Sequence, residues 1–313
     1  MAWSSIRKKR MKPVQQHFDL IDKSVNSNSH FKKILSRSLN EFPPFFQSKN
    51  AVIFNRDCLE VLLSIPENSI DMIFADPPYM LSNGGFTCQN GKMANVNKGK
   101  WDKSNGFEED TAFHNEWISA CRHILKPEGT IWISGTYHSI FQCGYLLQKN
   151  NFHILNDITW FKPNASPNLS CRFFTASHET LIWARKDRKA KHTFNYDLMK
   201  NGAFPEDKMK KENTQMRSVW SIPAPKNGEK EYGKHPTQKP IDLLLRIIKA
   251  STKSGDIILD PFNGAGTTGV AALLVGSRYY IGSEIDVNYC RLTAKRLSQA
   301  EKNNEEYLFS AGY

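Results

Sequence analysis

Two short strings of this 313-residue sequence combine residue types that could do chemistry. The first is Asp76-Pro77-Pro78-Tyr79, which directly follows the nearly all-apolar run Ile70–Ala75. The two prolines fix the backbone and remove competing N–H donors. The string therefore places a carboxylate, free carbonyl oxygens and an aromatic ring at the end of a predicted strand, where ligands of open α/β sheets bind. The alternative is a Pro-Pro turn that happens to carry an Asp and a Tyr.

The second string, DPFNGAGTTG at residues 260–269, joins a strand-like run to a helix-like run. Its glycines spell GxGxxG, which lets the backbone approach a ligand, and the N-terminus of a helix offers free N–H donors. Glu284 follows 18 residues after Gly266, where a carboxylate can bind both hydroxyls of a ribose. The string predicts a site for a cofactor that contains a nucleoside, although GxGxxG alone also occurs in purely structural turns.

These strings require strands and helices that alternate along the chain. Short apolar runs predict strands, and longer runs with apolar residues on one face predict helices. Such alternation predicts an α/β fold with a parallel sheet covered by helices on both sides. The predicted strands are Ala51–Asn55, Ile70–Ala75, Thr130–Ser134, Ile154–Phe161, Glu179–Ala184, Asp256–Leu259 and Tyr279–Ile281, and the predicted helices are Cys58–Ser64, Phe107–Leu125, Tyr137–Gln148, Ile241–Ala250, Gly264–Val275 and Val287–Leu297.

Positive charge is concentrated in two segments of a chain whose net charge is +11. Residues 1–50 carry 10 basic and 3 acidic side chains, and residues 186–234 carry 12 and 7. Basic segments on a nearly neutral body suit a polyanion such as nucleic acid, although a solvated face and a loose tail would give the same pattern. We interpret residues 1–50 as a tail or loosely packed arm, and the long polar loop 82–105 as functional.

Composition excludes several classes of protein. No apolar run approaches the roughly 18 residues of a membrane helix, and the first residues lack the apolar core of a secretory signal. The six cysteines are scattered without a CxxC pair, which predicts reduced thiols in the cytoplasm and no metal site.

The two strings together resemble the amino-group DNA methyltransferases that use S-adenosylmethionine. The similarity spans residues 51–300, and the tetrad precedes the glycines as in the circularly permuted β group of that family. It implies one Rossmann-like domain with a mostly parallel seven-stranded sheet and a target-recognition insert. The chain then divides into a basic N-terminal arm (1–50), a catalytic half (51–185), the insert (186–234), an S-adenosylmethionine-binding half (235–300) and a C-terminal tail (301–313). Further strings that agree are Asn55-Arg56-Asp57-Cys58-Leu59 and His235-Pro236-Thr237-Gln238-Lys239-Pro240.

Closer strings are similar to two kinds of adenine methylase. One is the second methylase of GATC restriction systems, which tolerates single strands, and the other is the cell-cycle-regulated methylase of GANTC sites. The loop strings Ser82–Gly85 and Lys98–Asp102 look more like the first kind, and few residues follow Leu297, whereas the second kind has a long C-terminal extension. The resemblance implies adenine-N6 methylation in GATC, or else GANTC, within a restriction-modification system. The implied partners are double- and single-stranded DNA, a restriction endonuclease and a second copy of the chain.

The resemblance also assigns roles to residues. Asp76 and the Pro77 carbonyl would hold the amino hydrogens of a flipped or single-stranded adenine, and the Tyr79 ring would stack on the base, with Pro78 completing the tetrad. The residues implied for S-adenosylmethionine are Asp57, Cys58, Thr237, Lys239, Asp260, Phe262, Asn263, Gly264, Gly266, Thr267, Thr268 and Glu284. The implied DNA contacts are Lys98, Lys100, Arg172, Arg188, Lys191, Lys208 and Arg217.

Some of these assignments have alternatives. Lys239 and Thr237 are expected near the methionine carboxylate of the cofactor. Asp57 is expected at the adenine edge of the cofactor, or else as the N-cap of the helix at 58–64. For the whole chain, an N4-cytosine methyltransferase, a catalytically silent DNA-binding module and a nicotinamide dehydrogenase remain as alternatives. An RNA or protein methylase is disfavoured, because such enzymes usually have Asn in place of Asp76.

Overall fold

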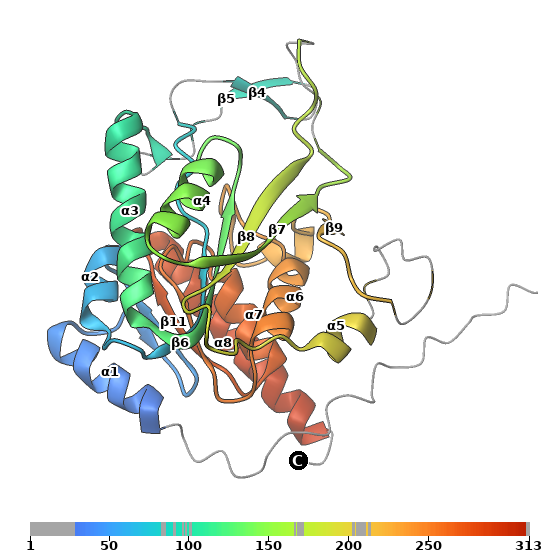
Figure 1. The fold of residues 1–313 in the computed structure, drawn as a ribbon. Coiled ribbons are helices and arrows are strands. Elements are labelled where there is room, and N and C mark those ends of the chain that lie inside the picture. Colours follow the sequence, from blue (N-terminus) through green and yellow to red (C-terminus); the bar gives the residue numbers. More distant parts are fainter. Residues whose placement is uncertain are drawn as a thin grey trace, which may run out of the picture.

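The structure is a computed structural model that describes residues 29–82, 86–89, 92–95, 97, 99, 102–165, 167, 172–201, 204, 211 and 214–310. Nine strands form one twisted sheet through the middle of the molecule (Figure 1). In order across the sheet they are β1 (Phe46–Gln47), β2 (Ala51–Phe54), β11 (Tyr279–Ser283), β10 (Ile257–Asp260), β3 (Ile70–Ala75), β6 (Leu125–Gly135), β8 (His178–Arg185), β7 (His153–Phe161) and β9 (Val219–Ser221).

The sheet corrects the prediction of a mostly parallel, seven-stranded sheet. All seven predicted strands are present, but β1 and β9 are added at the two edges. Five of the eight strand pairs are parallel, whereas β8 runs antiparallel to both β6 and β7, and β1 runs antiparallel to β2. The two edge strands are only two or three residues long, which is too short for a pattern of apolar residues to predict them. The α/β class itself is confirmed.

Helices cover both faces of the sheet (Figure 1). One layer holds α1 (Ser29–Glu41), α2 (Cys58–Ser64), α3 (Phe107–Ile124) and α4 (Ile140–Lys149), and the other holds α6 (Ile241–Ser251), α7 (Thr267–Val275) and α8 (Val287–Ser310), with α5 (Tyr196–Asn201) packed on α6. The strand β3 contributes Ile73 to the core on the first side and Met72 and Phe74 to the core on the second side. Its continuous apolar sequence follows from burial on both faces.

The sequence suggested that residues 1–50 form a tail or loosely packed arm, but part of this segment is packed firmly against the core. Within α1, Phe31, Ile34 and Leu35 are at most 5% exposed and belong to the first core. Phe31 precedes Ile34 by three residues and Leu35 by four, so the three side chains lie on one face of the helix. The many basic residues of the segment make this pattern hard to recognise in the sequence. Residues 1–28 lie outside the described part of the chain.

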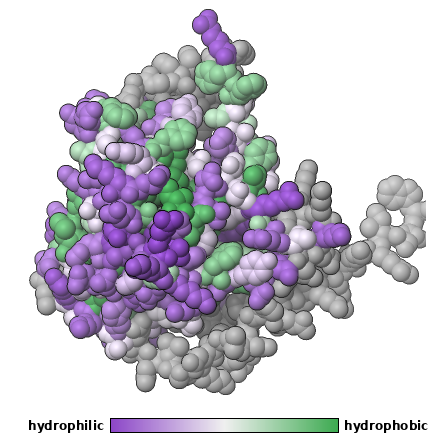
Figure 2. Space-filling view, in the orientation of Figure 1, coloured by the Kyte–Doolittle hydropathy of each residue, from purple (hydrophilic) through white to green (hydrophobic). Residues whose placement is uncertain are grey.

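Two other segments also contain more structure than their composition indicates. The polar loop 82–105 includes the hairpin of β4 (Phe86–Gln89) and β5 (Lys92–Asn95), drawn at the top of Figure 1. The basic segment 186–234 contributes α5 and β9, and its Trp220 is only 6% exposed in the second core. The face drawn in Figure 2 is largely hydrophilic, with a narrow hydrophobic strip near its centre. No helix of the described residues is long and apolar enough to span a membrane.

Candidate active site

The two chemically promising strings lie side by side in the fold. Asp76 directly follows β3 and Asp260 ends β10, and these two strands are parallel neighbours, with Met72 opposite Ile258. Carboxyl ends of adjacent parallel strands share one edge of a sheet. A cavity of about 240 Å³ opens at this edge and is lined by residues of both strings, among them Asp76, Asp260 and Gly264. The predicted juxtaposition is therefore confirmed.

Asp76 stands in a compact network of charged and polar side chains. Its Oδ2 accepts a hydrogen bond from Nζ of Lys239 at 2.5 Å, and its Oδ1 accepts one from the Tyr79 hydroxyl at 2.7 Å. The same hydroxyl lies 2.9 Å from Oε2 of Glu179 and 2.9 Å from Oγ of Ser134. Strands β6 and β8, the segment after β3 and the segment before α6 thus bring together residues that are more than 160 positions apart in sequence.

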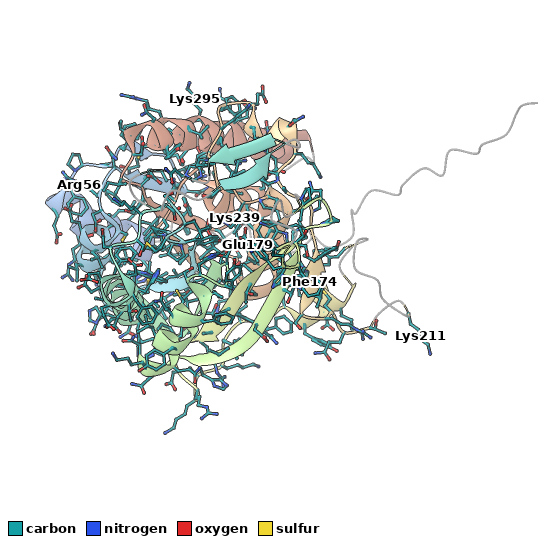
Figure 3. All side chains as sticks on the ribbon, turned by 90° about the horizontal axis from the view of Figure 1, so that it is seen from above. Arg56, Phe174, Glu179, Lys211, Lys239 and Lys295 are labelled. Atoms are coloured by element: carbon teal, nitrogen blue, oxygen red, sulfur yellow. The ribbon has the colours of Figure 1, made fainter. Side chains whose placement is uncertain are left out.

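Glu179 carries the second carboxylate of the network. Its Oε2 lies 3.6 Å from Nζ of Lys239, and its Oε1 accepts a short hydrogen bond from Lys162. The side chains of Lys239 and Glu179 are 6% and 11% exposed. Figure 3 shows both near the centre of the molecule, whereas Phe174 lies toward its edge. Two carboxylates and two ammonium groups therefore neutralise one another in the interior.

Burial and neighbouring charges set the ionisation of the network. Burial raises the pKa of Asp76; the Lys239 charge opposes this rise and the Glu179 charge adds to it. Burial alone would also raise the pKa of Glu179, but Lys239 and Lys162 together lower it to about 2. Glu179 is thus ionised across the physiological range, whereas Asp76 is the carboxyl that is harder to ionise.

The glycine turn holds a second pair of carboxylates. Gly266 precedes α7 with φ of +71°, a left-handed conformation that glycine adopts without strain. Oε2 of Glu284 accepts a hydrogen bond from the Gly264 N–H at 2.7 Å, and Oδ2 of Asp260 accepts one from the Thr268 hydroxyl at 2.6 Å. Burial raises the pKa of both carboxyls to about 7. Acidic groups that ionise near neutral pH in a cavity are typical of ligand sites.

Eleven of the twelve predicted cofactor residues line the cavity, and Gly266 is the exception. Several of them also have contacts within the protein. Lys239 binds Asp76 directly; Asp57 caps α2 by accepting a hydrogen bond from the Leu59 N–H at 2.8 Å, so the capping alternative is confirmed. Burial raises the pKa of the Cys58 thiol to about 12, so this thiol keeps its proton.

Several residues of the site are absent from the sequence-based prediction. Glu179 and Ser134 lie in strands; the charge of Glu179 close to the apolar run Leu181–Ala184 of β8 was a signal that could have found it. Asp102, which is 2% exposed, accepts hydrogen bonds from the backbone N–H groups of Tyr79 at 2.9 Å and Met80 at 3.0 Å. Nothing in its sequence neighbourhood indicates this role. Asp102 therefore holds the backbone of the loop that carries the Asp76–Tyr79 string.

The four predicted DNA contacts that lie among the described residues are not brought together. Arg172 is exposed and precedes β8, on the same edge as Asp76. Arg188 and Lys191 follow the end of β8, which the pairing of Arg185 with Thr130 places at the opposite edge. Arg217 lines a separate cavity between β7, β8 and α5. The remaining predicted contacts, Lys98, Lys100 and Lys208, lie outside the described residues.

The described residues contain no group of three or more His, Cys, Asp or Glu side chains arranged to hold a metal ion.

Comparison with known proteins identifies the family. The family model described as DNA methylase (N6_N4_Mtase) matches residues 70–295. The chain is 51% identical to type II methyltransferase M2.MboI of Moraxella bovis, covering 81% of this chain and 90% of that protein. It is 48% identical to type II methyltransferase M2.DpnII of Streptococcus pneumoniae, covering 83% and 94%.

Solved structures show the same fold. The M1.HpyAVI–SAM complex is 29% identical, with a TM-score of 0.57 over 79% of this chain and 98% of that chain. The cytosine-N4-specific PvuII DNA methyltransferase is 20% identical, with a TM-score of 0.62 over 83% of this chain and 94% of that chain. With the matches in sequence, the fold and the paired strings at one sheet edge, this chain belongs to the DNA methylase family and is a DNA methyltransferase.

Proposed function

We propose that this enzyme transfers a methyl group from S-adenosylmethionine to N6 of an adenine in DNA, with GATC as the preferred site and GANTC as the second choice. The observation that carries the proposal is the position of the Asp76 carboxylate in the wall of the cavity beside the glycine turn. One feature of the site can bind an amino group and the other can bind a nucleoside, and both open into the same space.

The residues of the cavity fit S-adenosylmethionine. Glu284 offers a carboxylate for ribose hydroxyls, and Phe262 offers an apolar ring. Oε1 of Gln238, which also lines the cavity, is buried and has no hydrogen-bond partner among the described residues, so the site has an acceptor ready for a ligand that carries a donor. When bound, S-adenosylmethionine supplies a methyl group on a positively charged sulfur.

The protein residues would act on the adenine amino group by positioning it. The lone pair of that nitrogen is delocalised into the ring, so the group is a weak nucleophile. Asp76 and the Pro77 carbonyl, both acceptors, hold its hydrogens and turn the nitrogen lone pair toward the methyl donor. The Asp76 carboxylate also accepts the proton that the amino group loses. The base leaves the helix or comes from a single strand, and catalysis is by orientation and preorganised charge.

The biological setting is proposed from similarity alone. The relatives M2.MboI and M2.DpnII are type II methyltransferases, and such similarity supports a restriction-modification role with an endonuclease as functional companion. We also propose that the enzyme forms a homodimer, acts on single strands as well as duplexes, and works in the cytoplasm, where its DNA substrate lies. The segment boundaries proposed from the sequence, after residues 50, 185, 234 and 300, are kept.

The test is methylation of a DNA duplex and of its separated strands with labelled S-adenosylmethionine, followed by digestion to nucleosides. N6-methyl-2′-deoxyadenosine formed only from substrates that contain GATC, and not from otherwise identical substrates that lack it, supports the proposal in full. N4-methylcytosine would replace it with the cytosine alternative, and DNA binding without product would indicate a silent binding module. Asp76→Ala is the control variant, and unchanged methyl transfer by it would refute the assignment of Asp76.

A further inference from the structure

The Tyr79 hydroxyl has too few protons for its neighbours. It lies within 2.9 Å of three oxygen atoms, which belong to Asp76, Glu179 and Ser134. A phenol can donate one hydrogen bond only, so it cannot satisfy both carboxylates at once. The two carboxylates therefore compete for this hydroxyl.

The Lys239 ammonium is shared in the same way. It lies 2.5 Å from Asp76 and 3.6 Å from Glu179. Glu179 in turn has Lys162 as a partner of its own, and the Lys162 ammonium is held over the Trp160 ring at 4.4 Å. Glu179 thus draws part of the Lys239 charge and part of the Tyr79 hydrogen bond away from Asp76.

We propose that Glu179 is a positioning residue of methyl transfer: by sharing Lys239 and the Tyr79 hydroxyl with Asp76, it keeps the Asp76 carboxylate oriented and free to accept a hydrogen from the substrate amino group. This inference rests on the proposed function of Asp76. An Asp76 carboxylate paired with Lys239 alone would turn toward that ammonium and be neutralised by it, and its affinity for the weakly acidic amino hydrogens of the substrate would fall.

The charges that face the network define the sign of the test. Asp76 faces Lys239, Glu179 and Asp260, and Lys239 also faces His235. The negative charge of Glu179 raises the pKa of Asp76. Removing that charge lowers the Asp76 pKa, because the remaining ammonium favours the ionised carboxylate.

The experiment measures kcat, the KM for S-adenosylmethionine and the pH profile of kcat for Glu179→Gln, which keeps the shape of the side chain. We expect kcat to fall about 10- to 100-fold, which is the usual effect of removing a residue that only holds another functional side chain in place. The KM for S-adenosylmethionine should change less than about threefold. We also expect the acid limb of the kcat profile to move to lower pH.

A matched control is Asp71→Asn. Asp71 is a carboxylate of similar exposure, 13% against 11%, that also binds a lysine, Lys126, but lies at the opposite end of β3 from Asp76. It should leave kcat and the pH profile unchanged. An acid limb of Glu179→Gln that stays in place or moves to higher pH would overturn the inference, as would a kcat equal to that of the wild type. Failure of the wild-type enzyme to methylate adenine would instead overturn the proposed function.

Discussion

Replacing Lys239 by methionine should destabilise the protein in a pH-dependent way. The ammonium lies 2.5 Å from Asp76 and 3.6 Å from Glu179, and the side chain is 6% exposed. At an effective dielectric constant of about 20, a unit charge pair at the shorter distance attracts by about 7 kcal/mol. Part of this is offset by desolvation, and breaking one partner of a buried pair typically costs about 3–5 kcal/mol.

The loss of stability should depend on whether the carboxyl groups that no longer have Lys239 as a partner can bind a proton. Without Lys239, the pKa of Asp76 in the folded state rises further above its value in the unfolded chain. Stability is then retained at low pH, where the carboxyl is protonated in both states, and is lost as the pH rises toward the folded pKa. The difference in free energy of unfolding between variant and wild type should therefore be larger at pH 8 than at pH 5.

Urea denaturation at both pH values measures this difference. Lys126→Met is the control, because Lys126 pairs with Asp71 away from the active site. The double variant Glu179→Gln/Lys239→Met should be more stable than Lys239→Met alone, because it removes one of two neighbouring carboxylate charges that repel each other once Lys239 is absent. A loss that is equal at both pH values, or a double variant less stable than the single one, would refute the proposed charge balance.

Three further predictions concern the glycine turn at residues 264–269 and the loop that carries the Asp76–Tyr79 string. Gly266→Ala should reduce stability by about 1–3 kcal/mol in urea denaturation, because φ is +71° and the added Cβ would lie 2.5 Å from Cγ2 of Thr293; a neutral effect would contradict the strain argument. The free energy of unfolding of the ligand-free protein should fall between about pH 4 and pH 7, because burial raises the pKa of Asp260 and Glu284 to about 7 in the folded state only, and Glu284→Gln should make that fall shallower; an unchanged slope would count against it. Asp102→Ala removes the acceptor for two backbone N–H groups of the tetrad loop, so kcat should drop about tenfold or more while the Kd for S-adenosylmethionine in calorimetry stays close to wild type; a weaker cofactor affinity with normal kcat would argue otherwise.

Local sequence patterns were sufficient for the fold class and for the two strings that meet in the site. Apolar runs of the right length predicted all seven inner strands, and in strands buried on both sheet faces, such as β3 and β10, the apolar sequence is nearly continuous. The glycine turn was predictable because a left-handed residue at the start of a helix requires glycine, and the resulting spacing of glycines is easily recognised in the sequence. The helix at 58–64 appears with the predicted bounds.

Other features depend on contacts between distant segments. The edge strands β1 and β9 form only because a neighbouring strand offers its free edge, and β8 is antiparallel to both of its neighbours, β6 and β7. A strand has the same apolar pattern in either direction, so its sequence alone does not reveal the antiparallel pairing.

The arrangement of charges in the active site also depends on the complete fold. The sequence predicted a carboxylate at Asp76 and, through resemblance, a cofactor role for Lys239, but it held no indication that Lys239 and Glu179 would both reach that carboxylate. Lys239 lies just before α6, Glu179 lies in β8 and Asp76 lies just after β3, and only the order of strands in the sheet makes them neighbours. Residue types and short-range spacing are properties of the chain. The distance between two side chains that are far apart in sequence is set only when the whole sheet has formed, and this distance in turn decides how the two groups ionise.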